Sequence, residues 1–213
     1  MEQRRLVPEL LDSLEATDPR AIRSRRDLRL INAFLGNERW IARQAREHSN
    51  TIRHLAELGA GEGTLTMRLH HTLPSATVTG LDLAPRPLKL PSPIEWIRGD
   101  FFKTLSATAA DTCTGNLILH HFQDEDLKKL GAILARFRLL IFAEPLRTPL
   151  TLALAQLALP LASDVTKHDM PASIRAGFRP GELPHLLVLD PNLWSVEEMA
   201  SRRGSIRLIA YRK

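Results

Sequence analysis

The residues best suited to hold a ligand lie at positions 57–63, where an apolar segment gives way to a predicted helix. Glycine has no Cβ and adopts positive φ at little steric cost, so a glycine turn lets backbone amides close around a bound molecule. The turn has the spacing G-x-G-x-G, at Gly59, Gly61 and Gly63. Asp82 ends the next apolar run about twenty residues later, the spacing at which an acid meets ribose hydroxyls. We therefore predict a nucleotide-like ligand, with Glu57 and Asp82 as hydrogen-bond acceptors.

The glycine spacing separates two kinds of nucleotide site. A dinucleotide fingerprint requires G-x-G-x-x-G, whereas Thr64 stands at the third glycine position, which disfavours a nicotinamide oxidoreductase. Together with Asp82, Asp100 and Phe101, residues 57–63 resemble the class I S-adenosylmethionine (SAM) dependent methyltransferases, in which an E/D-x-G-x-G-x-G loop wraps the methionine moiety. The resemblance covers residues 51–145.

This resemblance implies SAM as the cofactor and S-adenosylhomocysteine (SAH) as its product. The implied cofactor-binding residues are Glu57, Gly59, Ala60, Gly61, Gly63, Asp82, Leu83, Asp100, Phe101 and Asn116. Asp100 and Phe101 match the adenine clamp of the family, with the carboxylate on the exocyclic amine and the aromatic ring over the base. A turn or helix cap is the alternative for Asp82 and Asp100, and a salt bridge to an arginine is the alternative for Glu57.

A histidine pair supplies the candidate base. Residues 116–125 resemble the L-H-D-W-S-D-E stretch of small-molecule O-methyltransferases, in which the histidine is the general base. His120 falls on that position, while His121 replaces the aspartate and Phe122 the tryptophan. Histidine accepts a phenolic or enolic proton near pH 7, so His120 is the first catalytic candidate and His121 the second. The alternative is that the pair only bonds to the backbone, with methyl transfer by proximity alone.

Two further segments are expected to cover the substrate. Residues 1–50 predict a helical attachment, with a short helix near residues 8–14, a longer one starting near Ser24 and a break at residues 36–37. Residues 144–185 form a proline-rich insertion around one apolar helix. The candidates for contact with substrate or cofactor from these segments are Arg26, Arg29, Asn32 and His168.

Alternating apolar runs and helical segments from residue 51 onward are typical of a parallel sheet covered by helices on both faces. Strands are predicted at residues 54–58, 76–81, 94–98, 116–119 and 138–143, and a closing pair at 193–199 and 205–211. The expected fold is α/β and Rossmann-like, with the seven-stranded, mostly parallel sheet of class I methyltransferases. Residues 51–213 would be the catalytic domain and residues 1–50 its lid.

Composition narrows the remaining choices. The chain has 213 residues, 44% of them apolar and 25% charged, which suits one folded domain with an attachment. Cys113 is the single cysteine, so no disulfide within the chain and no cysteine-based zinc cluster is expected, and no histidine and carboxylate share a recognised metal-ligand spacing. The longest apolar run, 149–159, is too short to span a membrane, and no leader pattern is present, which favours a cytoplasmic protein.

We expect methyl transfer to a small organic acceptor, namely a phenolic or enolic hydroxyl of a secondary metabolite or quinone-like compound. A C-methyltransferase and an RNA methyltransferase are alternatives, the latter because the net charge is +5 and five arginines crowd into residues 20–29. An alternative of another class is a non-catalytic binding or scaffold protein that keeps the SAM fold. The sequence predicts no particular oligomeric state.

Overall fold

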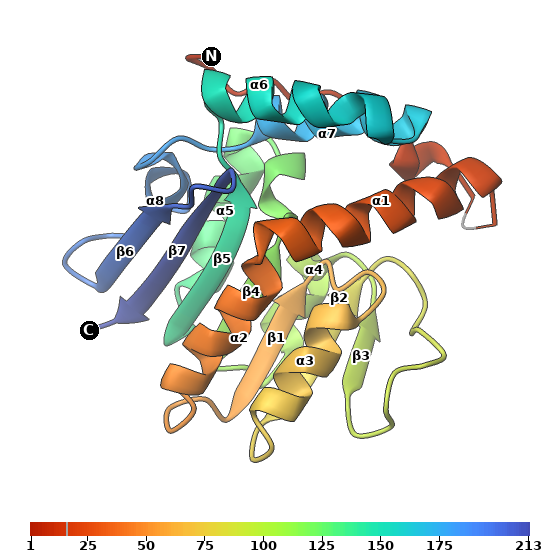
Figure 1. Cartoon of the computed structure of the whole chain (residues 1–213). Coiled ribbons are helices and arrows are strands. Elements are labelled where there is room, and N and C mark those ends of the chain that lie inside the picture. The colour runs from red at the N-terminus through yellow and green to blue at the C-terminus, as the bar shows by residue number, and fades with distance from the viewer. Residues whose placement is uncertain (16) are drawn as a thin grey trace.

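Seven strands form one sheet in the computed structural model, which describes residues 1–15 and 17–213. The sheet order is β3-β2-β1-β4-β5-β7-β6 (Figure 1). The parallel strands are β1 (His54–Leu58), β2 (Thr77–Asp82), β3 (Glu95–Arg98), β4 (Thr112–Asn116) and β5 (Leu139–Pro145). The antiparallel pair is β6 (Trp194–Ala200) and β7 (Ser205–Arg212), with β7 against β5. The predicted mostly parallel α/β sheet is confirmed.

The order of the strands indicates where a sheet of this kind binds a ligand. From β1 the chain moves outward to β2 and β3, and then returns to β4 on the other side of β1. At such a reversal the two connections leave on opposite faces, and a crevice opens beyond the carboxyl ends of the two central strands. The residues that follow β1 and β4 therefore border the natural binding position of this sheet.

Helices cover both faces of the sheet, and the strand residues alternate between them. On one face, α2 (Asn37–Glu47) and α3 (Thr64–Thr72) pack with Leu139 and Ile141 of β5. On the other face, α4 (Phe101–Thr104), α5 (Asp124–Leu134) and α8 (Glu182–Leu186) pack with Leu140 and Phe142. Because both faces are buried, β5 is buried along its length and apolar from Leu139 to Ala143, as the sequence predicts for a central parallel strand.

A further layer lies beyond the carboxyl ends of the strands. It consists of α1 (Pro19–Leu35), α6 (Pro149–Ala158) and α7 (Asp164–Ala176), with the short 3-10 helix η4 (Leu159–Leu161) between the last two (Figure 1). The N-terminal segment, defined as residues 1–13 and ending in the 3-10 helix η1 (Leu11–Ser13), runs alongside α6 and α7. None of the described helices is both long and apolar enough to cross a membrane.

Three sequence predictions about this layer are corrected. The longer N-terminal helix begins at Pro19 and not near Ser24, because Asp18 caps it by accepting from the Arg20 backbone N–H. Ser24 is buried, and its hydroxyl lies 3.1 Å from that of Thr166. The short helix near residues 8–14 is only the single turn η1, and the insertion holds three α-helices where one was predicted. The break at Gly36 is confirmed, since this residue has φ 69° between α1 and α2.

The fourth strand is also shifted from its prediction. It spans Thr112–Asn116 and ends where the sequence predicted it to start. Its threonines are polar in sequence yet buried, because their hydroxyls find partners: Thr114 donates to the Ile141 carbonyl at 2.7 Å. Leu117 then adopts φ 55°, which turns the chain out of the sheet. Cys113 is buried in this strand.

Candidate active site

The glycine turn has the backbone conformation that its spacing predicts. Gly59, Gly61 and Gly63 have φ values of 63°, 52° and 74°. A Cβ on Gly59 would lie 2.6 Å from the side chain of Ile118, so the turn packs directly against the chain that leaves β4. A Cβ on Gly61 would meet only a backbone oxygen at 4.0 Å. One side of the turn is therefore packed, and the other is open.

Asp82, at the end of β2, connects this strand to the glycine turn. One carboxylate oxygen accepts from the Gly61 backbone N–H at 2.7 Å, and the other accepts from Ala84 N–H, also at 2.7 Å. The second bond is the turn contact that was the alternative to ribose binding, and the carboxylate is half-buried. The neighbouring Leu83 leaves 72% of its surface exposed. Both residues border the open side of the turn.

Glu57, at the end of β1, is 3% exposed. Its carboxylate accepts a hydrogen bond from the Thr66 hydroxyl at 2.5 Å, and no ion pair to an arginine is seen within the described part of the chain. Burial raises the pKa of Glu57 to about 8, because a charged carboxylate loses its hydration there. The salt bridge considered as the alternative is therefore replaced by a neutral hydrogen bond.

The two candidate asparagines carry buried oxygens that accept no hydrogen bond from the described residues. They are Asn116 Oδ1, at the end of β4, and Asn32 Oδ1, near the end of α1. A buried acceptor without a donor costs about 1–3 kcal/mol. A bound ligand with N–H or O–H donors near these oxygens would remove that cost, which favours binding.

The lid arginines lie on the exposed side of α1. Arg29 pairs with Glu62 of the glycine turn at 3.0 Å, with both side chains about half exposed. Arg26, one turn earlier, is exposed. The pair shows that α1 reaches the turn, although an exposed ion pair stabilises a protein by at most about 1 kcal/mol.

The two residues of the predicted adenine clamp make local contacts in this structure, and their role in binding adenine stays a prediction. Asp100 caps α4, accepting from the Phe102 backbone N–H at 3.0 Å, which is the turn role considered as the alternative. The Phe101 ring is 7% exposed and packs against Phe102 and Phe122, with centroids 5.0 and 5.3 Å away. Little of that ring is free to cover a base.

His120 is held by a carboxylate that the sequence analysis missed. The residue lies in the 3-10 helix η3 (Leu119–His121) after β4, and its Nδ1 lies 2.8 Å from Glu144, which is fully buried at the end of β5. Glu144 also accepts from the backbone N–H groups of Ile118 and Leu119, at 3.0 and 2.8 Å. The imidazole therefore donates from Nδ1, and its Nε2 points away from the sheet's end.

The N-terminal segment covers that second ring nitrogen. Glu9 lies 3.6 Å from His120 Nε2, beyond hydrogen-bond distance, and accepts from the Ser173 hydroxyl of α7. Burial alone would lower the pKa of His120, but the carboxylates of Glu144 and Glu9 outweigh it and raise the pKa to about 9. Burial and the charge on His120 lower the pKa of His121, whose ring centroid is 4.2 Å from that of His120.

The same segment is fixed by the histidine–aspartate pair of the insertion. Asp169 is buried and accepts from the backbone N–H groups of Leu10 and Leu11, at 2.8 and 3.0 Å. His168 bonds to the same carboxylate at 2.8 Å and is itself exposed. His168 therefore lies on the outer side of the segment, whereas Asp169 anchors the segment over η3.

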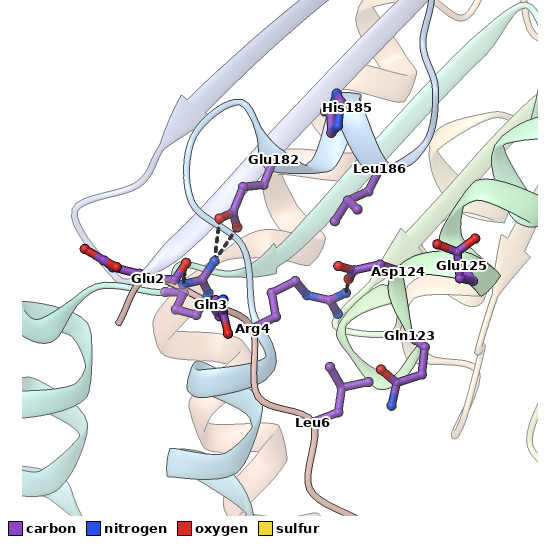
Figure 2. A pocket seen from close by; sticks show the side chains of 11 residues that line it. Glu2, Gln3, Arg4, Leu6, Gln123, Asp124, Glu125, Glu182, His185 and Leu186 are labelled. Atoms are coloured by element: carbon purple, nitrogen blue, oxygen red, sulfur yellow. Dashed lines mark hydrogen bonds and ion pairs between the residues drawn. The ribbon is translucent and has the colours of Figure 1, made fainter.

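A pocket of about 510 Å³ lies beside this centre, between the N-terminal segment, the start of α5 and α8 (Figure 2). Both arginines that line the pocket are paired, Arg4 with Asp124 and Arg147 with Glu182, each at 2.5 Å. Arg4 also donates to the carbonyl oxygens of His120 and Phe122. The pocket thus lies behind η3, and neither the glycine turn nor the His120 ring lines it.

Comparison with known proteins gives the fold but no close relative in sequence. No protein-family model matches the chain, and no curated protein matches it. The plantazolicin methyltransferase BamL, solved with a triazolic desmethylPZN analog and SAH, superposes with a TM-score of 0.73 at 11% identity, over 95% of this chain and 92% of that one.

Two other solved structures are similar. Human N-acetylserotonin methyltransferase (ASMT), solved with SAM, has a TM-score of 0.65 at 19% identity, over 94% of this chain and 61% of that one. The methyltransferase domain of bacterial-CtHen1-C has a TM-score of 0.60 at 15% identity, over 84% and 98%. These likenesses confirm the predicted fold class, a Rossmann-like class I methyltransferase fold.

Proposed function

We propose that this chain is a SAM-dependent methyltransferase that methylates a phenolic or enolic hydroxyl of a small organic molecule. The observation that carries the proposal is the contact between two sites: Ile118 packs on Gly59 of the glycine turn and lies two residues before His120. A cofactor on the turn and an acceptor at His120 would thus be neighbours. SAM in the ASMT structure and SAH in the BamL structure support SAM as the cofactor.

The residues around the turn suit that cofactor. The open side of Gly61 leaves room for a ligand against the backbone, and Asp82 offers carboxylate oxygens for ribose hydroxyls. The free oxygens of Asn116 and Asn32 suit the ammonium group of a methionine moiety. When bound, SAM supplies the electrophilic methyl group on its sulfonium.

His120 accepts the proton of the acceptor hydroxyl in this proposal. Glu144 keeps the Nδ1 proton in place and orients the ring, so that Nε2 is the basic atom. With Glu9 nearby, the pKa of about 9 keeps the ring protonated at pH 7. An acceptor that displaces Glu9 removes one of the two carboxylates that raise this pKa, and the ring then becomes a competent base.

The test is His120→Ala, assayed for methyl transfer to a panel of phenols and enols, with SAM binding measured by calorimetry. We expect turnover to fall by ~10² or more, the usual scale for loss of a general base, with SAM affinity retained. The matched control is His71→Ala, which changes one member of the other adjacent histidine pair, on the surface of α3. Equal turnover in the wild type and His120→Ala would rule out proton transfer by this residue.

The other function classes give different results in the same experiments. A scaffold protein would bind neither SAM nor SAH, and an oxidoreductase would bind NAD. An RNA methyltransferase would show a steeply salt-dependent shift with bulk RNA in electrophoresis. Any of these outcomes would replace the small-molecule proposal.

A further inference from the structure

Glu9, His120 and His121 form a cluster of metal-ligating side chains at the acceptor end of the molecule. Their ligand atoms all lie within 4.8 Å of one another. We propose that these three residues bind a divalent metal ion of the Zn²⁺ class, and that the bound ion holds the N-terminal segment over the acceptor site and inhibits methyl transfer. The inhibition, but not the binding, rests on the role proposed above for His120.

The distances are close to those of a real site. Zinc binds imidazole nitrogen and carboxylate oxygen at about 2.0–2.2 Å, so two ligands of a tetrahedral site lie about 3.3 Å apart. The separation of His120 Nε2 and Glu9 Oε1 is 3.6 Å. The cluster as a whole would close by roughly an ångström around the ion, a shift within reach of side-chain rotation in the partly exposed His121 and the N-terminal segment.

The surrounding hydrogen bonds hold two of the ligands in place. Glu144 accepts from His120 Nδ1, so Nε2, which faces Glu9, is the ring nitrogen that can bind a metal once it has lost its proton. This carboxylate–histidine arrangement is the one that orients most metal-binding histidines. The Ser173 hydroxyl in turn donates to Glu9. A cluster formed by chance on a surface would have no such support behind its ligands.

The ligand types select the metal. Two imidazoles and one carboxylate suit Zn²⁺, Co²⁺ or Ni²⁺, whereas Mg²⁺ and Ca²⁺ prefer oxygen ligands only. Three protein ligands leave a fourth position for water. Asp12, whose carboxylate lies 3.9 Å from His121 Nδ1, offers a further oxygen ligand.

The metal and the proposed reaction would both need the same atom, His120 Nε2. The metal would use the lone pair of His120 Nε2, which is the same lone pair that would accept the acceptor's proton. Glu9 would also be fixed in the place that an acceptor must enter. Metal binding and methyl transfer are therefore mutually exclusive.

The test titrates the full-length protein, purified with a chelator and dialysed, with Zn²⁺ by calorimetry and with Co²⁺ by visible absorption. We expect one Zn²⁺ per chain and the intense absorption of four-coordinate Co²⁺. Glu9→Gln and His121→Ala should each weaken Zn²⁺ binding by ~10²-fold or more, and Glu144→Gln by about 10–100-fold, the usual effect of an outer-shell partner. Circular dichroism of each variant checks that it is folded.

His71→Ala is again the matched control, because it removes a surface histidine from an adjacent pair on α3. Its Zn²⁺ affinity should equal that of the wild type. No Zn²⁺ binding by the wild type, or an equal loss in His71→Ala and His121→Ala, would overturn the site.

Two further measurements separate this inference from the proposed function. SAM affinity and turnover, measured in chelator, report on the methyltransferase alone. If Zn²⁺ binds at the cluster while SAM does not, the proposed function fails and the metal site stands. If turnover is found and added Zn²⁺ neither binds nor inhibits, the metal site fails and the methyltransferase stands.

Discussion

Glu57 and Glu144 are two carboxylates buried at the carboxyl ends of parallel strands, and they differ in how their charge is accommodated. Glu57 receives one hydroxyl, from Thr66, and its pKa is raised to about 8. Glu144 receives backbone N–H groups and the His120 imidazole. A buried carboxylate is stable only when donors replace its hydration. Protein groups therefore stabilise the charge of Glu144, whereas Glu57 has a single hydroxyl donor and favours its neutral form.

The largest expected effect comes from removing Glu144, the carboxylate whose charge the protein's own donors stabilise. Glu144→Ala would leave buried backbone N–H groups and the His120 ring without their acceptor, so the free energy of unfolding should fall by about 3–5 kcal/mol. Denaturant titration measures this change. Glu125→Ala is the control, an exposed acid on α5 paired only with Lys128, which should change stability by less than about 1 kcal/mol. Equal effects of the two substitutions would contradict the structural role of Glu144.

Glu57, the carboxylate with a single hydroxyl donor, should make the free energy of unfolding depend on pH. Because the pKa of Glu57 is raised from 4.5 to about 8, the folded state holds this proton more tightly than the unfolded state. Its contribution to stability is therefore full below about pH 4.5 and is lost as the pH rises toward about 8. Glu57→Gln stays neutral and keeps an acceptor for Thr66, so its stability relative to the wild type should grow across this window by a few kcal/mol, at ~1.4 kcal/mol per pKa unit. Denaturant unfolding of both proteins at about pH 5, 6.5 and 8, which span this window, measures the change.

The exposed Glu62→Gln, on the same turn, is the control for that measurement. The difference between its stability and that of the wild type should stay nearly constant over the same pH range. A constant difference for Glu57→Gln as well would show that Glu57 is already charged in the folded protein.

A smaller effect is expected from the glycine turn. Gly61→Ala places a side chain at φ 52°. Gly181→Ala is the matched control, since it places a side chain at φ 85° and nothing lies within 4 Å of its new Cβ. Both should cost about 1–2 kcal/mol of stability, the penalty of left-handed backbone for an L-residue. Only Gly61→Ala should also weaken SAM binding, by about tenfold or more, which is over 1.4 kcal/mol. Equal SAM affinity of the two variants in calorimetry would place the cofactor away from the turn.

The smallest effect should come from the lid contact. Arg29→Ala removes an exposed ion pair to Glu62, so stability should change by less than about 1 kcal/mol, and the change should shrink in high salt. Thermal unfolding at low and high salt measures it. A loss of several kcal/mol would mean that α1 is fixed to the turn and does not act as a lid.

Local patterns were sufficient to predict the glycine turn and the carboxylate that bonds to it. The glycine spacing and a charged residue after each apolar strand gave the turn, Glu57 and Asp82, and the structure brings the turn and Asp82 together. Glu144 carries the same signal, a carboxylate directly after the apolar run of β5, and applying that rule to every strand would have found it. Glu9 carries no local signal, because the fold of a distant segment alone brings it to His120.

The misplaced fourth strand has a related cause. In sequence, Thr112 and Thr114 look polar, and residues 117–119 look like a buried strand. In the fold, the threonine hydroxyls bond within the core, and the apolar residues form the turn that carries His120. Hydrophobic periodicity gives the existence of such a strand but not its bounds when hydroxyls are satisfied internally.

The way the N-terminal segment is anchored has a consequence for the order in which the chain folds. Leu10 bonds to Asp169, 159 residues away, and Arg4 to Ala176, 172 residues away. The glycine turn is local by comparison, with Gly61 and Asp82 only 21 residues apart and Glu57 and Thr66 only 9. Contacts that close long loops cost more entropy and form later. During synthesis, the N-terminal segment therefore cannot dock until α7 has been made. The glycine turn can form well before the N-terminal segment covers His120.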